Sequence, residues 1–120
     1  MIPYKNRFHG HSSLDYTYRR GQSTRSKFFN IKTIPNKKRT ESRIAVVVSK
    51  KIYKSAVRRN LIRRRVYEYL RPLINQFNQI RDVVIIITNK EFISLSHQEL
   101  LTQFDQALDQ AGIVTRKSGQ

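Results

Sequence analysis

The apolar positions of the chain follow recurring patterns, and each pattern predicts a type of secondary structure. Residues 27–34 alternate, with Phe29 and Ile31 on one side, which is typical of a half-buried strand. Residues 43–49 and 83–88 are continuous apolar runs rich in valine and isoleucine. Such runs predict strands that are buried more fully. Together the three segments predict a small sheet, with a charged turn-forming loop between the first two strands.

The start of the chain predicts a different organisation. Residues 1–11 are basic and irregular, and we expect them to form an extended arm. Residues 12–20 predict a short helix that turns Leu14 and Tyr18 inward at i,i+4 spacing and ends at Gly21. This first helix would therefore pack against the sheet through its apolar side.

Two longer helices follow from the remaining apolar positions. The first begins near Ser55, and Pro72 is expected to end or kink it. Its apolar residues form one stripe: Ile62, Val66, Tyr69, Leu70 and Leu73. The second begins with a capping box, Ser96 with Glu99, and stops at Gly112. The residues that it is expected to bury are Leu100, Phe104, Ala107, Leu108 and Ala111.

These elements predict an α+β fold in the order α-β-β-α-β-α, with a small mixed β-sheet and helices packed on one side of it. We expect a single domain over residues 1–120, with a frayed tail over residues 113–120. The strand 43–49, the long helix and the strand 83–88 form a βαβ crossover, for which general physics favours a right-handed connection.

Charge adds a function class to this picture. The 120 residues carry a formal net charge of +16 and no cysteine. Residues 1–71 hold 20 Lys and Arg against three acids, whereas residues 72–120 hold four against five. Because such self-repulsion is relieved by a polyanion, we expect a nucleic-acid partner. No run of apolar residues approaches a membrane span and residues 1–10 do not resemble a signal peptide, so we expect a soluble, cytoplasmic protein with no membrane partner.

Few residues suggest catalysis or metal binding. Asp105 and Asp109 lie on the polar side of an amphipathic helix, where a solvated face explains them. His9 and His11 have no third ligand nearby. We therefore expect no catalytic residue and no metal site on this chain.

The segment Lys50–Arg71 is the main candidate for binding. It holds nine basic residues, six of them arginine, and one acid, Glu68, yet it keeps a helical apolar period. A face kept only for solubility would intersperse acids with the bases. The residues beside and beyond one edge of the stripe are Arg59, Asn60, Arg63, Arg64 and Tyr67, and those on the other edge are Arg58 and Arg65. Since arginine contacts phosphates bidentately, these residues predict an RNA- or DNA-binding surface.

Aromatic residues in the basic half add a possible stacking surface for single strands. Tyr18 and Phe29 have the phase of core residues, whereas Phe8 and Tyr16 are better candidates for exposed rings.

Several motifs resemble those of one protein family. Lys50-Lys51, a short basic spacer with Ala56, and then Arg59-Asn60 followed by Ile62-Arg63-Arg64 are similar to the RNR motif of the bacterial ribonuclease P protein subunit. Asn6-Arg7-Phe8 and the short helix ending in Tyr18-Arg19-Arg20-Gly21 also resemble that family, and the element order agrees over about residues 5–112. The chain departs from the pattern at Leu61, where the motif has an arginine, and in the loop after Ile52, which lacks a glycine common in the family. The helix period places Leu61 away from the apolar stripe.

The resemblance implies an accessory subunit of a ribonucleoprotein endonuclease. A large catalytic RNA would remove the 5′ leader of precursor tRNA with Mg²⁺ held mainly by RNA and none by the protein alone. A cleft between the first helix and the sheet would hold the leader, and the crossover would be left-handed. The residues implied in RNA contact are Lys50, Lys51, Arg59, Asn60, Arg63 and Arg64, and those implied on the leader side are Arg7, Phe8 and Tyr18, to which Tyr16 and Arg19 are added as exposed neighbours.

Two other classes remain open at this point. A ribosomal-type structural RNA-binding protein would share the charge but needs no leader cleft. A protein-only nuclease is disfavoured by the scarcity of paired carboxylates.

Overall fold

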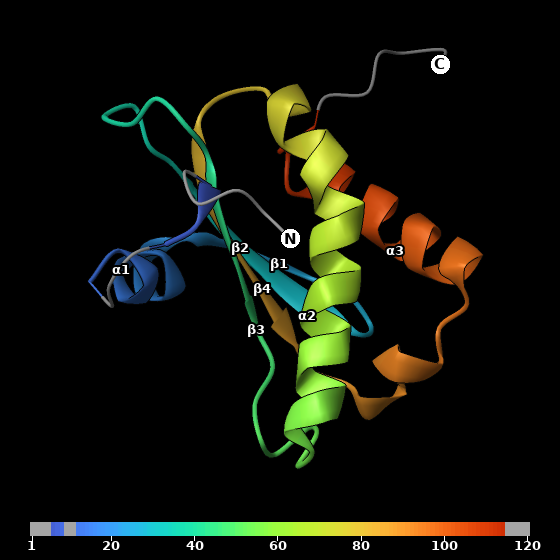
Figure 1. Ribbon diagram of the computed structural model, residues 1–120. Helices are drawn as coiled ribbons and strands as arrows, with labels where there is room; N and C mark the ends of the chain where they lie inside the picture. Colours follow the sequence, from blue (N-terminus) through green and yellow to red (C-terminus); the bar gives the residue numbers. More distant parts are fainter. Residues whose placement is uncertain (1–5, 9–11, 115–120) are drawn as a thin grey trace.

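The computed structural model describes residues 6–8 and 12–114, which form a sheet with helices around it (Figure 1). The helices and strands in chain order are α1 (Ser12–Arg20), β1 (Gln22–Arg25), β2 (Phe29–Pro35), β3 (Arg43–Val47), α2 (Ala56–Leu70), β4 (Arg81–Ile87) and α3 (His97–Gln110). Two 3₁₀ segments, η2 (Arg71–Gln76) and η3 (Lys90–Ser94), precede β4 and α3 respectively. The α+β class predicted from the sequence is confirmed.

The four strands form one mixed sheet in the order β1-β2-β4-β3. β3 runs parallel to β4, whereas the β1–β2 and β2–β4 pairs are antiparallel. β1 corrects the predicted order, because the sequence analysis found no strand there. Its four residues, Gln-Ser-Thr-Arg, carry no apolar alternation, and it forms through backbone pairing with β2 at the sheet edge. The handedness of the β3–α2–β4 crossover stays a prediction.

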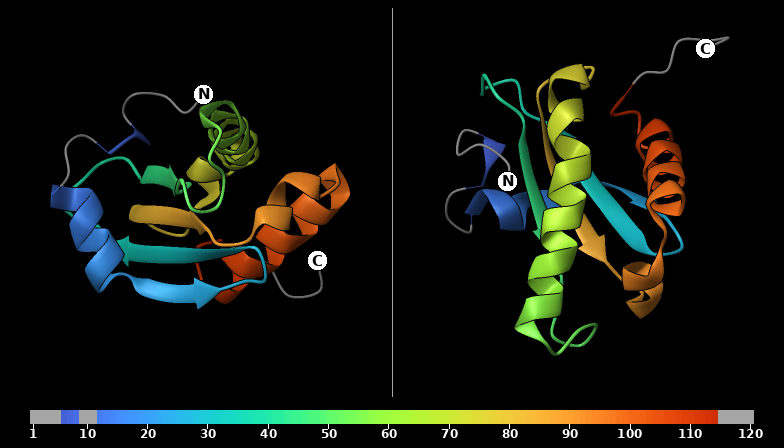
Figure 2. Two further views of the ribbon diagram at one scale, coloured as in Figure 1. Left: turned by 90° about the horizontal axis from the view of Figure 1, so that it is seen from below. Right: turned by 45° about the vertical axis from the view of Figure 1, so that its right-hand side comes forward.

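The helices cover both faces of the sheet, which corrects the expectation that they lie on one side. On one face, the Phe29 ring stacks on Phe104 of α3 with ring centroids 4.3 Å apart. Three positions along β2, the Lys32 Nζ atom donates a hydrogen bond to the Tyr18 carbonyl of α1 at 2.9 Å. Since side chains alternate along a strand, positions 29 and 32 point to opposite faces. α1 therefore lies across the sheet from α2 and α3 (Figure 1; Figure 2).

The hydrophobic core fills the face between the sheet, α2 and α3. The predicted α2 stripe is confirmed: Ile62, Val66 and Leu70 are fully buried, and Tyr69 and Leu73 pack against them in part. The α3 stripe is also buried, behind a capping box in which Ser96 and Glu99 bond to each other's backbone. α2 ends at Leu70, where the chain continues as a 3₁₀ segment with Pro72 in its first turn.

α1 meets the sheet through a smaller residue than expected. Thr17 is fully buried, whereas Tyr18 is 45% exposed, so the inward phase assigned to Tyr18 is wrong. Gly21 ends the helix as predicted, and its N–H donates to the Thr17 carbonyl at 2.8 Å. A Cβ atom at Gly21 would stand 2.4 Å from that carbonyl oxygen, so the turn admits no side chain.

Both ends of the described chain are more ordered than the sequence analysis expected. Asn6 is buried and donates from Nδ2 to the Ser42 carbonyl at 2.7 Å, and Arg7 forms a parallel bridge with Ile44. At the other end Ile113 is fully buried, so the expected frayed tail does not begin at residue 113. The rest of the expected arm and tail, residues 1–5, 9–11 and 115–120, lies outside the described residues.

Candidate nucleic-acid interface

The first turn of α2 is held firmly by its neighbours. Ser55 caps the helix, its Oγ accepting from the Arg58 N–H at 3.3 Å. The Arg59 Nη1 atom donates to the carbonyls of Tyr53 and Lys54 at 3.0 and 2.9 Å. The Tyr53 hydroxyl in turn donates to the Lys90 carbonyl. These bonds join the β3–α2 loop to the helix and to η3, and they fix the position of the first turn of α2.

The outward side of this segment carries most of the predicted RNA-binding residues. Those that are exposed are Lys50, Lys51, Arg58, Asn60 and Arg64. Arg63 is half-buried, and its Nη1 atom donates to Asn60 Oδ1 at 2.8 Å, which fixes both side chains on the same surface. We name the outward side chains Arg58, Asn60, Arg63 and Arg64 the outer face of α2. They present donors and positive charge, and Glu68 is the one acid in the segment Lys50–Arg71.

Besides Arg59, two further residues of the predicted RNA-binding set have bonds inside the protein. Arg65 Nη2 donates to the Leu95 carbonyl. The Tyr67 hydroxyl accepts from the Val46 N–H of β3 at 3.2 Å, and burial raises the pKa of Tyr67 above its ordinary value. Both bonds fasten α2 to the rest of the fold. The structure therefore separates Arg65 and Tyr67 from the exposed residues that sequence spacing had grouped with them.

Leu61 lies on solvent-facing helix surface, as the sequence analysis expected. It is 50% exposed, and Val57, one turn before it, is 77% exposed. The position where the family motif has an arginine is thus apolar but outward-facing here, so the substitution does not disturb the core.

The predicted leader residues surround the opposite side of the sheet. The exposed ring of Tyr18 lies beneath the Lys32 ammonium, with Nζ 4.7 Å from the ring centroid. The Phe8 ring lies against the Arg43 guanidinium at 4.7 Å. Tyr16 is exposed and lines a cleft of about 740 Å³. Its other lining residues are Ile34, Pro35, Asn36, Lys37, Lys38, Arg43 and Asp82.

The remaining two leader candidates are exposed at the surface. Arg19 forms an exposed i,i+4 ion pair with Asp15 at 3.2 Å. Arg7 is exposed beside the β3 edge. Arg43 contacts the Phe8 ring and lines the cleft together with Tyr16. Tyr18 and Lys32 lie on the same face of the sheet.

Sequence reasoning missed the cations that accompany these rings. Lys32 alternates with the buried residues of β2, so its outward position could have been found from strand periodicity. Arg43 gave no such signal, because its partner Asp82 lies 39 residues away. Lys37 and Lys38 had been assigned only to a charged loop.

Among the described residues, no group of three or more histidine, aspartate or glutamate side chains could hold a metal ion. The buried carboxylate of Asp82 is engaged by Arg43 and Asn36.

A rigid α+β body with an arginine-bearing helix surface and exposed aromatic rings beside cations has the architecture of a nucleic-acid-binding protein. Comparison with known proteins defines it further. The family model described as Ribonuclease P matches residues 2–112. The chain therefore belongs to the ribonuclease P protein family, whose members pair with ribonuclease P RNA.

Individual relatives agree with this assignment. The ribonuclease P protein component of a Pseudanabaena species is 31% identical over 88 residues, which cover 73% of this chain and 76% of the relative. That of a Synechococcus species is 27% identical over 128 aligned positions, covering 94% and 98% of the two chains. Both relatives align over most of their own length.

Solved structures show the same fold. The Staphylococcus aureus RNase P protein superposes with a TM-score of 0.81 at 22% identity, over 92% of this chain and 98% of that one. The Thermotoga maritima RNase P protein gives a TM-score of 0.75 at 23% identity, over 87% and 96% of the two chains. Within the described residues, no helix has the length and apolar character needed to cross a membrane.

Proposed function

We propose that this chain is the protein subunit of ribonuclease P, which binds the catalytic RNA and the 5′ leader of precursor tRNA and assists removal of that leader. The observation that carries the proposal is the outer face of α2 in a chain of this family. Arg58, Arg63 and Arg64 stand together on a helix whose opposite side is locked into the core. Such a surface tracks phosphates by charge and bidentate hydrogen bonds.

The catalytic groups and Mg²⁺ are assigned to the RNA. Since the described residues hold no group of three or more histidine, aspartate or glutamate side chains that could bind a metal ion, we derive no chemical step through this chain. Its contribution is electrostatic: a cationic body relieves repulsion between a catalytic RNA and an RNA substrate, and so raises substrate affinity. We also propose a cytoplasmic location, because the protein would meet both RNA partners there.

The leader is assigned to the α1 face of the sheet. Tyr18 with Lys32, and Phe8 with Arg43, each combine an aromatic ring with a cation. Ring stacking with nearby positive charge holds single strands without reading their sequence. This suits a leader, since leaders differ in sequence from one tRNA precursor to another.

Cleavage of precursor tRNA at low Mg²⁺ tests the proposal. The protein alone, the cognate catalytic RNA alone and the two together are compared at several Mg²⁺ concentrations. We expect no cleavage by the protein, weak cleavage by the RNA, and faster cleavage at lower Mg²⁺ by both. Cleavage by the protein alone would contradict the accessory role. An RNA that the protein does not stimulate would favour a ribosomal-type structural role instead.

A further inference from the structure

An anchored arginine lies at the end of the sheet, inside the cleft that Tyr16 lines. We propose that Arg43, Lys37 and Lys38 form a seat for one phosphate group of an RNA single strand, positioned by Asp82. The inference rests on the proposed function, since it assigns this seat to the precursor-tRNA leader. It adds a phosphate contact to a face on which the sequence had indicated chiefly aromatic rings.

Arg43 is held as part of the protein's frame. Its Nε and Nη2 atoms donate to the two carboxylate oxygens of Asp82 at 2.9 and 2.6 Å, in the parallel arrangement typical of bidentate pairs. The two side chains are only 6% and 5% exposed. A buried pair of this kind keeps the guanidinium in one orientation.

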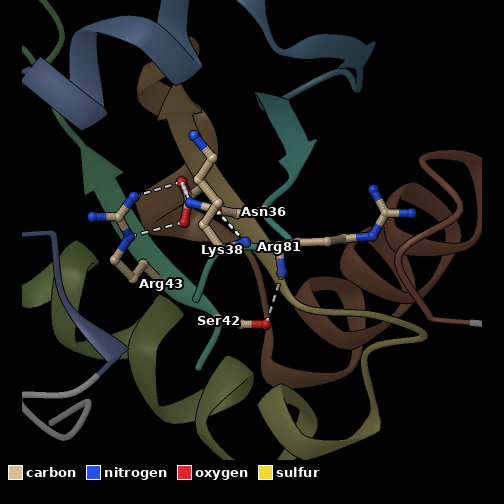
Figure 3. A network of polar contacts seen from close by, with 6 residues as sticks. Asn36, Lys38, Ser42, Arg43 and Arg81 are labelled. Atoms are coloured by element: carbon tan, nitrogen blue, oxygen red, sulfur yellow. Dashed lines mark hydrogen bonds and ion pairs between the residues drawn. The ribbon is translucent and has the colours of Figure 1, made fainter. Parts of the chain in front are cut away.

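One edge of this guanidinium is left for a ligand. Its Nη1 atom has no acceptor among the residues that the structure describes, and Figure 3 shows it pointing away from the carboxylate. Within the described residues, Thr33 Oγ1 is the one buried side-chain polar atom without a hydrogen-bond partner. Nη1 of Arg43 is therefore not sealed off from a ligand. The guanidinium carbon lies over the Phe8 ring, 4.7 Å from its centroid, so an anion is expected to approach at the Nη1 edge.

The same carboxylate organises the lysine loop. Asn36 Nδ2 donates to Asp82 Oδ2 at 2.9 Å, and the Asn36 side-chain oxygen accepts from the Lys38 N–H at 3.3 Å (Figure 3). Asn36 therefore fixes the turn that carries Lys37 and Lys38 to the rim of the cleft. Asp82 thus acts as a positioning residue for the arginine directly and for the lysines through Asn36.

The charge balance of the cleft suits an anion. Arg43 cancels Asp82, and the two lysines leave a net positive charge on a cleft of about 740 Å³. Lysines on a loop alone would be explained by solubility. Here they line the same cleft as a buried guanidinium that Asp82 holds in one orientation, so a fixed donor and two mobile cations are available to one ligand. The exposed Tyr16 ring provides an adjacent surface for a base.

A scan of neutral linkages in the leader tests the seat in the holoenzyme reconstituted with its cognate RNA. Precursor tRNAs carrying one methylphosphonate at successive leader positions are bound to wild-type, Lys37→Ala and Lys38→Ala proteins. Arg39→Ala is the matched control, because it removes one exposed charge from the same loop without lining the cleft. For the wild type we expect one position where the neutral linkage weakens binding by about threefold to tenfold.

At that position the neutral linkage should weaken binding to the Lys37→Ala and Lys38→Ala variants much less than binding to the wild type. Arg39→Ala should behave as the wild type does. Arg43→Lys keeps a cation beside Asp82 but has no second nitrogen for the phosphate, so it should lose the same position-specific effect. A cooperative urea transition of Arg43→Lys is the check that this variant is folded. Equal effects of the linkage in all variants, or coupling to Arg39 instead, would overturn the seat. A protein that stimulates cleavage but shows no coupling refutes only the seat, whereas one that does not stimulate refutes the proposed function.

Discussion

The outer face of α2 and the far end of the sheet use arginine in opposite ways. Arg58 and Arg64 are exposed, and no side-chain hydrogen bond is recorded for either one within the described residues. Arg43 and Arg81 are 5% and 8% exposed, and both are bonded to side chains or carbonyls of the fold. The net charge of +16 therefore overstates the charge that faces a partner. Burial and bonding, more than residue count, decide which cations are available to RNA.

Intermediate cases lie between these two regions. Arg59 and Arg65 stand on α2 but donate to carbonyls of the Tyr53–Lys54 loop and of Leu95. Since a guanidinium has five N–H donors, one internal bond leaves others for a phosphate. We expect these residues to contribute to both stability and binding, and the following variants separate the two contributions.

The largest effect is expected from Asp82→Ala. This change leaves the buried Arg43 charge without its partner and removes the acceptor of Asn36, and it should lower the free energy of unfolding by about 3–5 kcal/mol. Urea denaturation measures the loss. The control is Asp15→Ala, which breaks the exposed ion pair to Arg19 and should cost less than about 1 kcal/mol. Equal losses in the two variants would mean that the Arg43–Asp82 pair is not a structural contact.

The opposite behaviour is expected on the outer face of α2. Replacing both Arg58 and Arg64 with alanine should leave the urea midpoint unchanged but weaken catalytic-RNA binding by roughly tenfold to a hundredfold. The slope of log affinity against log salt should become shallower by about 1.4–1.8, because two phosphate contacts are lost. Filter binding over a salt series measures both quantities. Replacing Arg25 and Arg39, which are exposed elsewhere, controls for net charge.

Arg59→Ala should combine the two behaviours on a smaller scale. The loss of its bonds to the Tyr53 and Lys54 carbonyls should cost about 1 kcal/mol of unfolding free energy. Affinity for the RNA should also fall, with a salt slope shallower by about 0.7–0.9. Denaturation and binding are measured on the same preparation. An effect on stability without any change in salt slope would place Arg59 with the internal arginines.

The smallest effect is expected from Tyr67→Phe, which removes the acceptor of the Val46 N–H and should cost about 1 kcal/mol at neutral pH. RNA affinity should not change, although sequence spacing grouped Tyr67 with the RNA-binding residues. Because burial raises the pKa of Tyr67, the unfolded state loses this proton first once the pH passes about 10. Wild-type stability should therefore fall above that pH and approach that of the variant, as denaturation at a series of pH values would show.

Sequence periodicity succeeded where one element alone decides the outcome. The α2 stripe, the helix start near Ser55 and the Ser96–Glu99 capping box were all predictable, because spacing and local hydrogen bonds determine them. The four-residue strand β1 was not, because it forms only by pairing with β2. Tyr18 had the phase of a core residue, yet the Lys32 ammonium of β2 lies over its exposed ring, and Thr17 takes the inward position.

The candidate site was predictable to the same extent. Exposed residues of α2 follow from the helix period, and Leu61 was correctly placed away from the stripe. The burial of Arg43 depends on Asp82, and the internal role of Tyr67 depends on Val46 of β3. Long-range partners of this kind have no effect on local spacing. The number of cations is therefore known from the sequence, but which of them are buried or bonded within the fold is not.

The bridge between Arg7 and Ile44 has a consequence for the protein before it meets its RNA. β3 is an outer strand of the sheet, and an outer strand with unpaired backbone groups can recruit a strand from another molecule. The Arg7 bridge occupies part of that edge and sets a positive charge beside it. The N-terminal segment thereby hinders edge-to-edge pairing of two copies, so its removal should increase the aggregation of concentrated, RNA-free protein.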